Sequence, residues 1–276
     1  MNIIGVGAAG CRIADVFGDY PQYKIFKIDV DITGESCYNV PKFETAEEYE
    51  AHDYPKLKSF FKGVKGETLV VIGGGGKIAC GTLKMLETIK KLPLSILYIQ
   101  PDQSLLGETQ RLQDRTVFGV LQEYARSAVF EKMYLVSNTI LDTVVGGAPI
   151  IGYYDKLNEA LVGTLHMLNV FNNTEPALGK IEKAKETHRI VTFGVFDIEK
   201  NTEKLFFPLD NGRDKCYIYS INEDKLKTDT GLLQRIKNQI VSKAEENLNI
   251  GYALYSNNYD YDVGYILMRT PHIQHN

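Results

Sequence analysis

The sequence has few cysteines and no long apolar segment. Its 4 cysteines among 276 residues form no CxxC pair and lack the density of a disulfide scaffold, which favours free thiols in a reducing compartment. No run of about 18 apolar residues occurs, so we expect no membrane segment. The apolar start has no basic flank and is interrupted by Gly5, Gly7 and Gly10, unlike a signal peptide. Together these features predict a cytoplasmic protein.

An excess of charge of one sign is also missing. The formal net charge of −4 gives no general attraction to nucleic acid, so we expect no nucleic-acid partner. Backbone N–H groups can still hold the phosphates of a bound nucleotide without lysine. His272 and His275 lie three residues apart in a polar end, where a tail is favoured over a metal site, and we predict no protein metal site. The chain is 44% hydrophobic and long enough for a large core and two domains.

Two glycine-rich loops are the most informative features that are present. The first, GVGAAGCR at 5–12, follows an apolar run at 2–6, and the second, GGGGKIACG at 73–81, follows another at 68–72. Each run is typical of a strand, and each loop leads into a helical pattern. The free N–H groups of a helix N-terminus bind anions, so two such turns can hold one polyphosphate from both sides.

Strands and helices alternate through the first half of the chain. This pattern predicts an α/β fold with a Rossmann-like, mostly parallel sheet, whose ligands lie at the carboxyl ends of the strands. Both glycine loops belong to that edge. The charged segment 44–62 favours a solvated helix with a flexible turn. The expected strands are 2–6, 24–29, 68–72, 94–100 and 132–137, and the expected helices are 9–18, 77–91 and 106–127.

After Pro149 the pattern changes to one long helix followed by strands. Leucines at spacings of three and four predict a buried central helix over 150–172, between a nucleotide-binding domain at 1–149 and a smaller α+β domain at 173–276. In the smaller domain we expect helices at 177–187 and 230–248, strands at 189–198 and 215–221, and a final pair of strands at 250–257 and 261–269 joined through 257–260.

The first loop by itself also fits a dinucleotide-binding protein. Gly5, Gly7 and Gly10 have the GxGxxG spacing, and Asp29 ends the second strand where an acid would hold a ribose hydroxyl. An NAD(P)-binding Rossmann oxidoreductase therefore remains an alternative. Four consecutive glycines at 73–76 argue against it, because their entropic cost calls for a ligand or tight packing at a place where a dehydrogenase has no evident need for them.

The order of these parts resembles the tubulin/FtsZ superfamily of GTP-binding filament proteins, of which this chain looks like a divergent and compact member. GVGAAGCR is similar to the family's first phosphate loop, and GGGGKIACG stands where its GGGTGTG-type signature belongs. The resemblance implies GTP or GDP as ligand, with Mg²⁺ as a candidate companion ion. It also implies self-assembly into a head-to-tail filament with the nucleotide between subunits; nothing in the sequence indicates an adaptor or cargo.

The resemblance and the chemistry of the residues together give a set of candidate nucleotide-binding residues. The two loops would hold phosphate, Lys77 would add a charge, and Asp29 or Asp31 would accept from the ribose or the base. Asn158 offers a donor and an acceptor to a guanine edge, next to Tyr153 and Tyr154, whose rings are able to stack on a base. The full set is Gly7, Ala8, Ala9, Gly10, Cys11, Asp29, Asp31, Gly73, Gly74, Gly75, Gly76, Lys77, Pro101, Glu108, Arg111, Asn138 and Asn158.

Departures from the family pattern put GTP hydrolysis in doubt. The threonine and later glycines of the second loop are replaced, and the family's third phosphate loop has no clear counterpart. After the central helix, Phe171 and Thr174 stand at the family's two acidic positions, and Glu175 is the only acid available as a catalytic residue. Water attack on a phosphoanhydride depends on orientation and charge, so a GTPase with this loop would be slow. A non-polymerising pseudo-GTPase partner is the remaining alternative.

Overall fold

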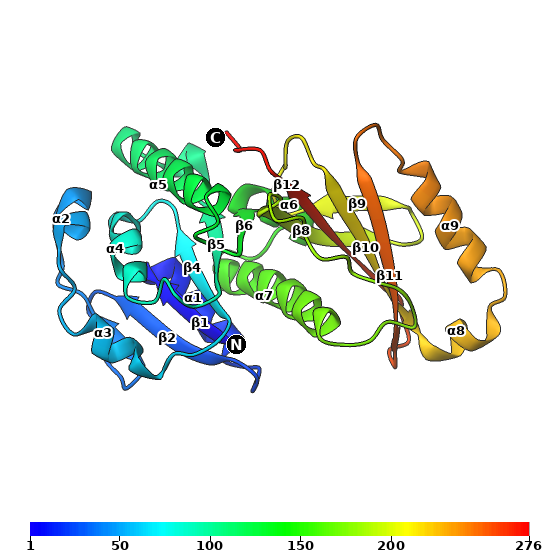
Figure 1. Cartoon of the computed structure of the whole chain (residues 1–276), viewed down its shortest axis with the longest axis horizontal. Coiled ribbons are helices and arrows are strands. Elements are labelled where there is room, and N and C mark those ends of the chain that lie inside the picture. Colours follow the sequence, from blue (N-terminus) through cyan, green and yellow to red (C-terminus); the bar gives the residue numbers. More distant parts are fainter. Residues whose placement is uncertain (276) are drawn as a thin grey trace.

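The structure is a computed structural model and describes residues 1–275. Its strands form one 12-stranded sheet in the order β3-β2-β1-β4-β5-β6-β8-β12-β10-β11-β7, with β9 beside β8 (Figure 1). The strands are β1 (Asn2–Val6), β2 (Lys24–Asp29), β3 (Cys37–Asn39), β4 (Thr68–Gly73), β5 (Leu94–Gln100), β6 (Lys132–Ser137), β7 (Leu178–Gly179), β8 (Ile190–Asp197), β9 (Thr202–Leu205), β10 (Asp214–Asn222), β11 (Asn249–Asn257) and β12 (Val263–Thr270).

Helices cover this sheet and connect its strands. They are α1 (Gly7–Phe17), α2 (Ala46–Ala51), α3 (Leu57–Phe60), α4 (Thr82–Glu87), α5 (Glu108–Arg126), α6 (Asn138–Val145), α7 (Tyr153–Asn172), α8 (Glu223–Thr228) and α9 (Leu232–Ser242), with 3₁₀ turns η1 (Phe61–Gly63), η2 (Lys77–Gly81) and η3 (Gln103–Leu105). Within the described residues, no helix has both the length and the apolar character needed to cross a bilayer.

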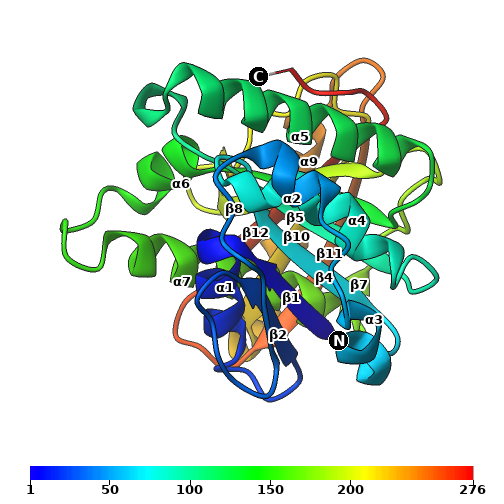
Figure 2. The same ribbon diagram turned by 90° about the vertical axis from the view of Figure 1, so that its left-hand side faces the viewer.

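The first half of the sheet is parallel and buried on both faces. Every pairing among β1 to β6 is parallel, as the alternation of strands and helices predicts. Because side chains alternate along a strand, Val70 and Ile72 of β4 pack into one apolar cluster and Leu69 and Val71 into the other. Helices α4 and α5 cover the first cluster and α1 and α7 the second (Figure 2). The predicted α/β fold with a mostly parallel sheet is confirmed.

Helix α7 joins the two halves of the sheet. Its buried leucines, from Leu157 to Leu168, share one cluster with Ile3 of β1 and with Ile218 of β10. Between the halves, β6 and β8 pair through only two register positions, Met133 with Ile190 and Tyr134 with Val191. The long helix therefore supplies much of the packing across this junction (Figure 1).

Four local expectations are wrong or incomplete. Residues 177–187 form no helix, because the chain after Pro176 runs extended along the edge of β11 and pairs with it as β7. Strands β11 and β12 are not a hairpin, since β10 lies between them, parallel to β11 and antiparallel to β12. The segment 44–62 is not simply solvated, because Tyr49, Tyr54 and Leu57 are buried in the core. The expected helix over 77–91 begins as η2 and is regular only over α4.

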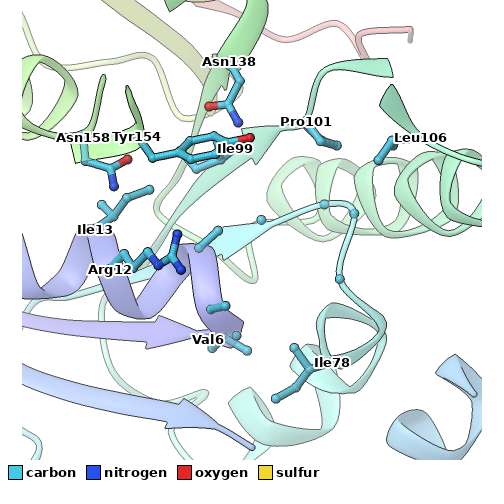
Figure 3. A pocket seen from close by; sticks show the side chains of 17 residues that line it. Val6, Arg12, Ile13, Ile78, Ile99, Pro101, Leu106, Asn138, Tyr154 and Asn158 are labelled. Atoms are coloured by element: carbon cyan, nitrogen blue, oxygen red, sulfur yellow. The ribbon is translucent and has the colours of Figure 1, made fainter. Parts of the chain in front are cut away.

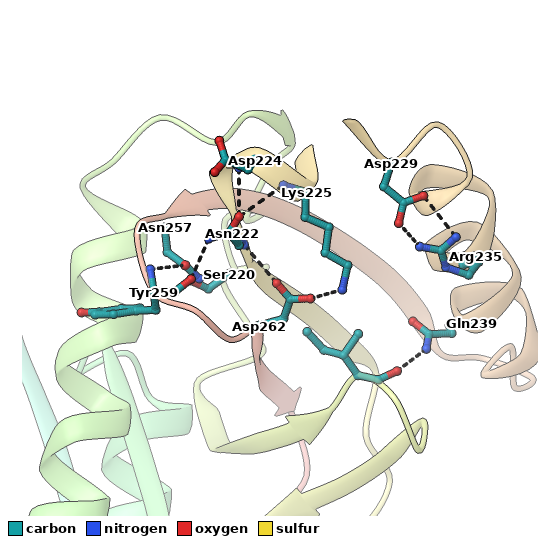
Figure 4. A network of polar contacts seen from close by, with 11 residues as sticks. Ser220, Asn222, Asp224, Lys225, Asp229, Arg235, Gln239, Asn257, Tyr259 and Asp262 are labelled. Atoms are coloured by element: carbon teal, nitrogen blue, oxygen red, sulfur yellow. Dashed lines mark hydrogen bonds and ion pairs between the residues drawn. The ribbon is translucent and has the colours of Figure 1, made fainter. Parts of the chain in front are cut away.

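A polar network fixes the outer helices to the second half of the sheet. The Asn222 side chain accepts from the N–H groups of Asp224 and Lys225 and so caps α8, while Asp262 accepts from the backbone N–H of Asn222 at 3.0 Å (Figure 4). Lys225 also forms an ion pair with Asp262. The start of α8 is thereby tied to the connection between β11 and β12.

Glu203 on β9 forms a second, more buried network. Its carboxylate accepts from the Tyr217 hydroxyl at 2.5 Å and from Lys215 Nζ at 3.1 Å, and Lys243 Nζ lies 3.4 Å away. Burial by itself raises the pKa of Glu203, but these hydrogen bonds and charges outweigh it and lower that pKa. The ionised carboxylate is therefore more stable in the folded chain than in the unfolded chain.

Replacing Glu203 with Gln should lower the free energy of unfolding at neutral pH by about 1.5–3 kcal/mol, because Lys215 loses its charged acceptor. A carboxyl group with a lowered folded-state pKa stabilises fully above its ordinary value of 4.5 and loses that effect as the pH falls through the folded value. Urea unfolding at neutral pH and at about pH 3 should therefore show a difference that shrinks in acid. The exposed Glu199→Gln is the matched control. An equal difference at both pH values would contradict this account.

Candidate functional site

A cavity of about 380 Å³ lies at the carboxyl ends of β1, β4 and β5, a volume typical of small-molecule sites (Figure 3). Both glycine loops line it, one from each side. Helices α6 and α7 and the segment after β5 complete the wall. The lining residues are Val6, Gly7, Ala8, Ala9, Arg12, Ile13, Gly73, Gly74, Gly75, Gly76, Ile78, Ile99, Pro101, Leu106, Asn138, Tyr154 and Asn158.

The first loop leads straight from β1 into α1. Gly7 has a φ of +71°, and a Cβ there would lie 2.7 Å from the Ile78 side chain, so this position requires glycine. Val6, the residue before the helix, has a side chain that makes no capping hydrogen bond. The N–H groups of the first turn of α1 consequently have no side-chain acceptor and remain available to an anion at this edge.

Two predicted members of the first loop serve packing and do not line the cavity. A Cβ on Gly10 would lie 2.3 Å from the carbonyl oxygen of Val71, so glycine allows α1 to approach β4 closely. The Cys11 thiol donates toward the carbonyl oxygens of Gly5 and Ile28, at 3.5 and 3.7 Å. Burial and the nearby Asp29 raise the pKa of Cys11 to about 12, so its thiol is protonated at neutral pH.

The second loop rests on a buried polar pair. A Cβ on Gly74 would lie 1.8 Å from Asp114 Oδ1 and 2.0 Å from the Tyr98 hydroxyl. Tyr98 donates to Asp114, which is fully buried on α5, and Gln103 Nε2 donates to its other oxygen at 2.7 Å. Gly74 is thus the position where the loop backbone crosses this pair. By contrast, a Cβ on Gly75 would meet only Leu106 and Pro101 at 3.5 Å, an ordinary contact.

Three polar side chains face the cavity from α6 and α7. Asn138 begins α6, Tyr154 lies in the first turn of α7, and Asn158 follows one turn later. The Tyr154 ring lies between the two amides (Figure 3). Within residues 1–275, neither amide has a hydrogen-bond partner. Two amides and an aromatic ring are suited to a flat heterocycle with polar edges. Tyr153, in contrast, packs against the core cluster beside α7.

Arg12 is the one charged residue in the wall, and sequence reasoning did not single it out. Its exposed side chain has no ion-pair partner among the described residues. Its position at the end of the first glycine loop, one turn into α1, was the signal that could have identified it. No carboxylate of residues 1–275 lines the cavity, so this part of the chain offers here none of the carboxylate ligands by which proteins usually hold Mg²⁺.

The other predicted site residues lie outside the cavity wall. Asp29 accepts from the N–H of Val30, and burial raises its pKa. Lys77 donates to the carbonyl oxygen of Glu44, and Arg111 to that of Leu106. Asp31, Glu108 and Glu175 are exposed and do not contribute to the wall. Glu175 follows the far end of α7, about 30 Å along a helix of this length from its first turn.

The contrast between Gly74 and Gly75 is testable. Gly74→Ala should lower the free energy of unfolding by about 1–3 kcal/mol, because the new methyl group overlaps the Tyr98–Asp114 pair. Gly75→Ala, its neighbour in the same loop, should change it by less than about 0.5 kcal/mol. Chemical denaturation of both variants measures the difference. Equal stability of the two would show that the loop does not rest on the buried pair.

No protein-family model and no curated protein matches the sequence. Solved structures do match it. A helical model of the TubZ-Bt four-stranded filament has a TM-score of 0.75 at 15% identity, over 97% of this chain and 85% of that chain. The GTPγS-form protofilament of Bacillus thuringiensis serovar israelensis TubZ has a TM-score of 0.71 at 14% identity, over 96% and 86%. An empty FtsZ dimer from M. jannaschii has a TM-score of 0.69 at 12% identity, over 98% and 87%.

These matches include α7 and the second half of the sheet as well as the glycine loops. A Rossmann-like first half alone would not produce coverage of this extent. The chain therefore has a divergent form of the tubulin/FtsZ fold.

Proposed function

We propose that this chain is a tubulin/FtsZ-like filament protein that binds a guanine nucleotide and assembles head to tail. The observation that carries the proposal is the convergence of both glycine loops on one cavity. The first turn of α1 and the backbone of 73–76 approach it from opposite sides, as two cradles for one polyphosphate would. The base would receive hydrogen bonds from the amides of Asn138 and Asn158, and it would stack on the ring of Tyr154.

The same cavity disfavours the dinucleotide alternative. In a dehydrogenase of the Rossmann type, the acid that ends the second strand holds the ribose. Here Asp29 does not line the cavity, and its carboxylate accepts from a neighbouring backbone N–H. The second loop also contributes as much of the wall as the first. Both features favour one mononucleotide held between two phosphate loops.

We propose that hydrolysis is weak or absent. Glu175 lies past the far end of α7, so it cannot act on the nucleotide of its own subunit and would have to reach that of a neighbour. Positions 171 and 174 carry Phe171 and Thr174, and Phe171 is buried against Tyr255. Orienting the attacking water molecule is a main contribution of the protein to phosphoryl transfer. A single exposed carboxylate is poorly suited to hold that water in place.

The solved relatives are consistent with self-assembly as the role of the fold. Those reported above include a four-stranded filament and a protofilament of TubZ. A contact between different surfaces of identical subunits repeats without closing and produces a filament. Under this proposal the protein assembles in the cytoplasm, and its binding partner is a second copy of the same chain. A pseudo-GTPase that binds nucleotide without assembling is distinguished by the experiments below.

The nucleotide can be identified directly. Protein purified gently and then denatured should release GDP or GTP, which chromatography identifies. Added GTP should produce filaments, visible by pelleting and electron microscopy, with slow release of phosphate.

Asn158→Ala should weaken guanine-nucleotide binding about tenfold or more, because two hydrogen bonds to the base are lost. Asn238→Ala, on the exposed face of α9, is the control. Binding of NADH without GTP would overturn the proposal, and GTP binding without filaments would favour the pseudo-GTPase.

An exposed apolar loop beside the cavity offers a second test. Residues 146–152 project from the molecule between α6 and α7 (Figure 2), and Ile150 and Ile151 are 95% and 93% exposed. Adjacent isoleucines this exposed are unfavourable in water and are suited to burial against the next subunit. They lie just before α7, whose first turn brings Tyr154 to the cavity, so that contact would lie close to the nucleotide.

Changing both Ile150 and Ile151 to Asp should leave nucleotide binding intact and raise the protein concentration required for assembly at least about tenfold, because two charges would be buried in the contact. Val241→Asp, at an exposed apolar position on α9, is the control. Pelleting across a concentration series with GTP measures the threshold. Filaments that form at the wild-type concentration would exclude this loop from the contact.

A further inference from the structure

A second cavity lies far from the glycine loops in the sequence, where β10 and β11 begin and β12 ends. Its outer part, which we call the outer chamber, is an open surface depression of about 410 Å³ lined by Lys185, His188, Arg213 and Asn249, among others. A small inner chamber of about 40 Å³ lies between residues 182–185 and the sheet. Lys185 and Asn249 belong to the walls of both chambers, and none of these residues lines the first cavity.

The inner chamber contains a buried cation without a partner. Arg269, near the end of β12, is only 5% exposed and lines this chamber. Its Nε atom is buried and has no hydrogen-bond partner, and within residues 1–275 no carboxylate lies at ion-pair distance from its guanidinium. The register partner of Arg269 on β10 is Asp214, whose carboxylate is already paired with His188, so the buried guanidinium keeps donor capacity for an anion.

The surrounding charges are also predominantly positive. Lys183, Lys185 and Arg213 line the two chambers and have no ion-pair partner among the described residues. The two carboxylates in these walls are already engaged. Asp214 pairs with His188, and Glu182 pairs with Lys180 at 3.8 Å.

Lys215 has its own counter-ion and is not part of the excess. It belongs to the inner wall, but its ammonium group lies 3.1 Å from Glu203. The excess positive charge thus comes from the arginines and lysines that face the chambers. The carboxylates in the same walls, Asp214 and Glu182, are paired with His188 and Lys180.

From this arrangement we propose that the cavity binds the phosphate group of a small phosphate monoester. The planar donor fork of a guanidinium matches a phosphate oxyanion, and lysine ammonium groups add charge without demanding one geometry. The phosphate occupies the junction where Lys185 and Asn249 line both chambers, within reach of Arg269. The outer chamber is several times larger than the inner one and holds the organic part of the ligand.

The proposal is tested by isothermal titration calorimetry of the full chain at constant ionic strength. The two ligands are inorganic phosphate and glycerol phosphate. Both ligands should bind, the ester more tightly. Arg269→Met, which keeps the length of the side chain and removes its charge, should weaken both at least about tenfold. Lys237→Met, an exposed position on α9, should leave both unchanged. Binding by Arg269→Met equal to that of the wild type would overturn the site, and equal affinity for both ligands would overturn the role of the outer chamber.

Two further experiments separate this site from the first cavity and from a folding defect. Saturating the first cavity with GDP should leave the measured phosphate binding unchanged, and its loss under GDP would assign that binding to the glycine loops and overturn the proposal. If Arg269→Met fails to fold, Lys185→Met and Arg213→Met, on the more open outer wall, carry the test. Weakened binding in both supports the site, and unchanged binding in both overturns it.

Discussion

The close approach of α1 to the sheet is the contact on which the rest of the site depends. A Cβ on Gly10 would lie 2.3 Å from the carbonyl oxygen of Val71, and one on Gly5 would lie 2.4 Å from that of Gly10. With no side chain between them, the first turn of α1 lies directly beside the end of β4. Because β1 and β4 are parallel neighbours, their two loops leave the sheet at the same edge and face each other. Gly5 and Gly10, which do not line the cavity, thus determine where the glycines of its wall lie.

Helix α7 extends this arrangement through the molecule. Its first turns bring Tyr154 and Asn158 to the cavity, and its last turn ends beside Tyr255 of β11, whose hydroxyl donates to the carbonyl oxygen of Phe171 at 2.8 Å. Its buried face packs against both halves of the sheet, whose direct pairing through β6 and β8 is short. A change of the first cavity that moved α7 would therefore be transmitted to the second half by packing. The helix couples the two regions physically, whichever ligand the cavity holds.

Much of the architecture could be predicted from local pattern, because strand and helix periods are local properties. The strands of the parallel half and the central helix lie where apolar spacing predicts them. The order of β10, β11 and β12 could not be predicted, since strand neighbours depend on contacts distant in sequence. The extended segment after Pro176 was missed for the same reason, because the edge of β11 determines its conformation. Of the residues that line the cavity, Gly7, the glycines at 73–76, Asn138 and Asn158 were among those predicted from the sequence, whereas Arg12 required knowledge of which side of α1 faces the cavity.

The wall of the first cavity carries little charge. Within residues 1–275, Arg12 is its only cation and no carboxylate lines it, so most of the stabilisation of a phosphate would come from backbone N–H groups and from the positive end of α1. Such dipoles are fixed by the fold and lose no side-chain entropy when a ligand binds, unlike a lysine. They also leave the net charge of −4 unchanged. An acidic protein can thus hold a highly charged anion, provided that its backbone is held in place by the contacts at Gly5, Gly10 and Gly74.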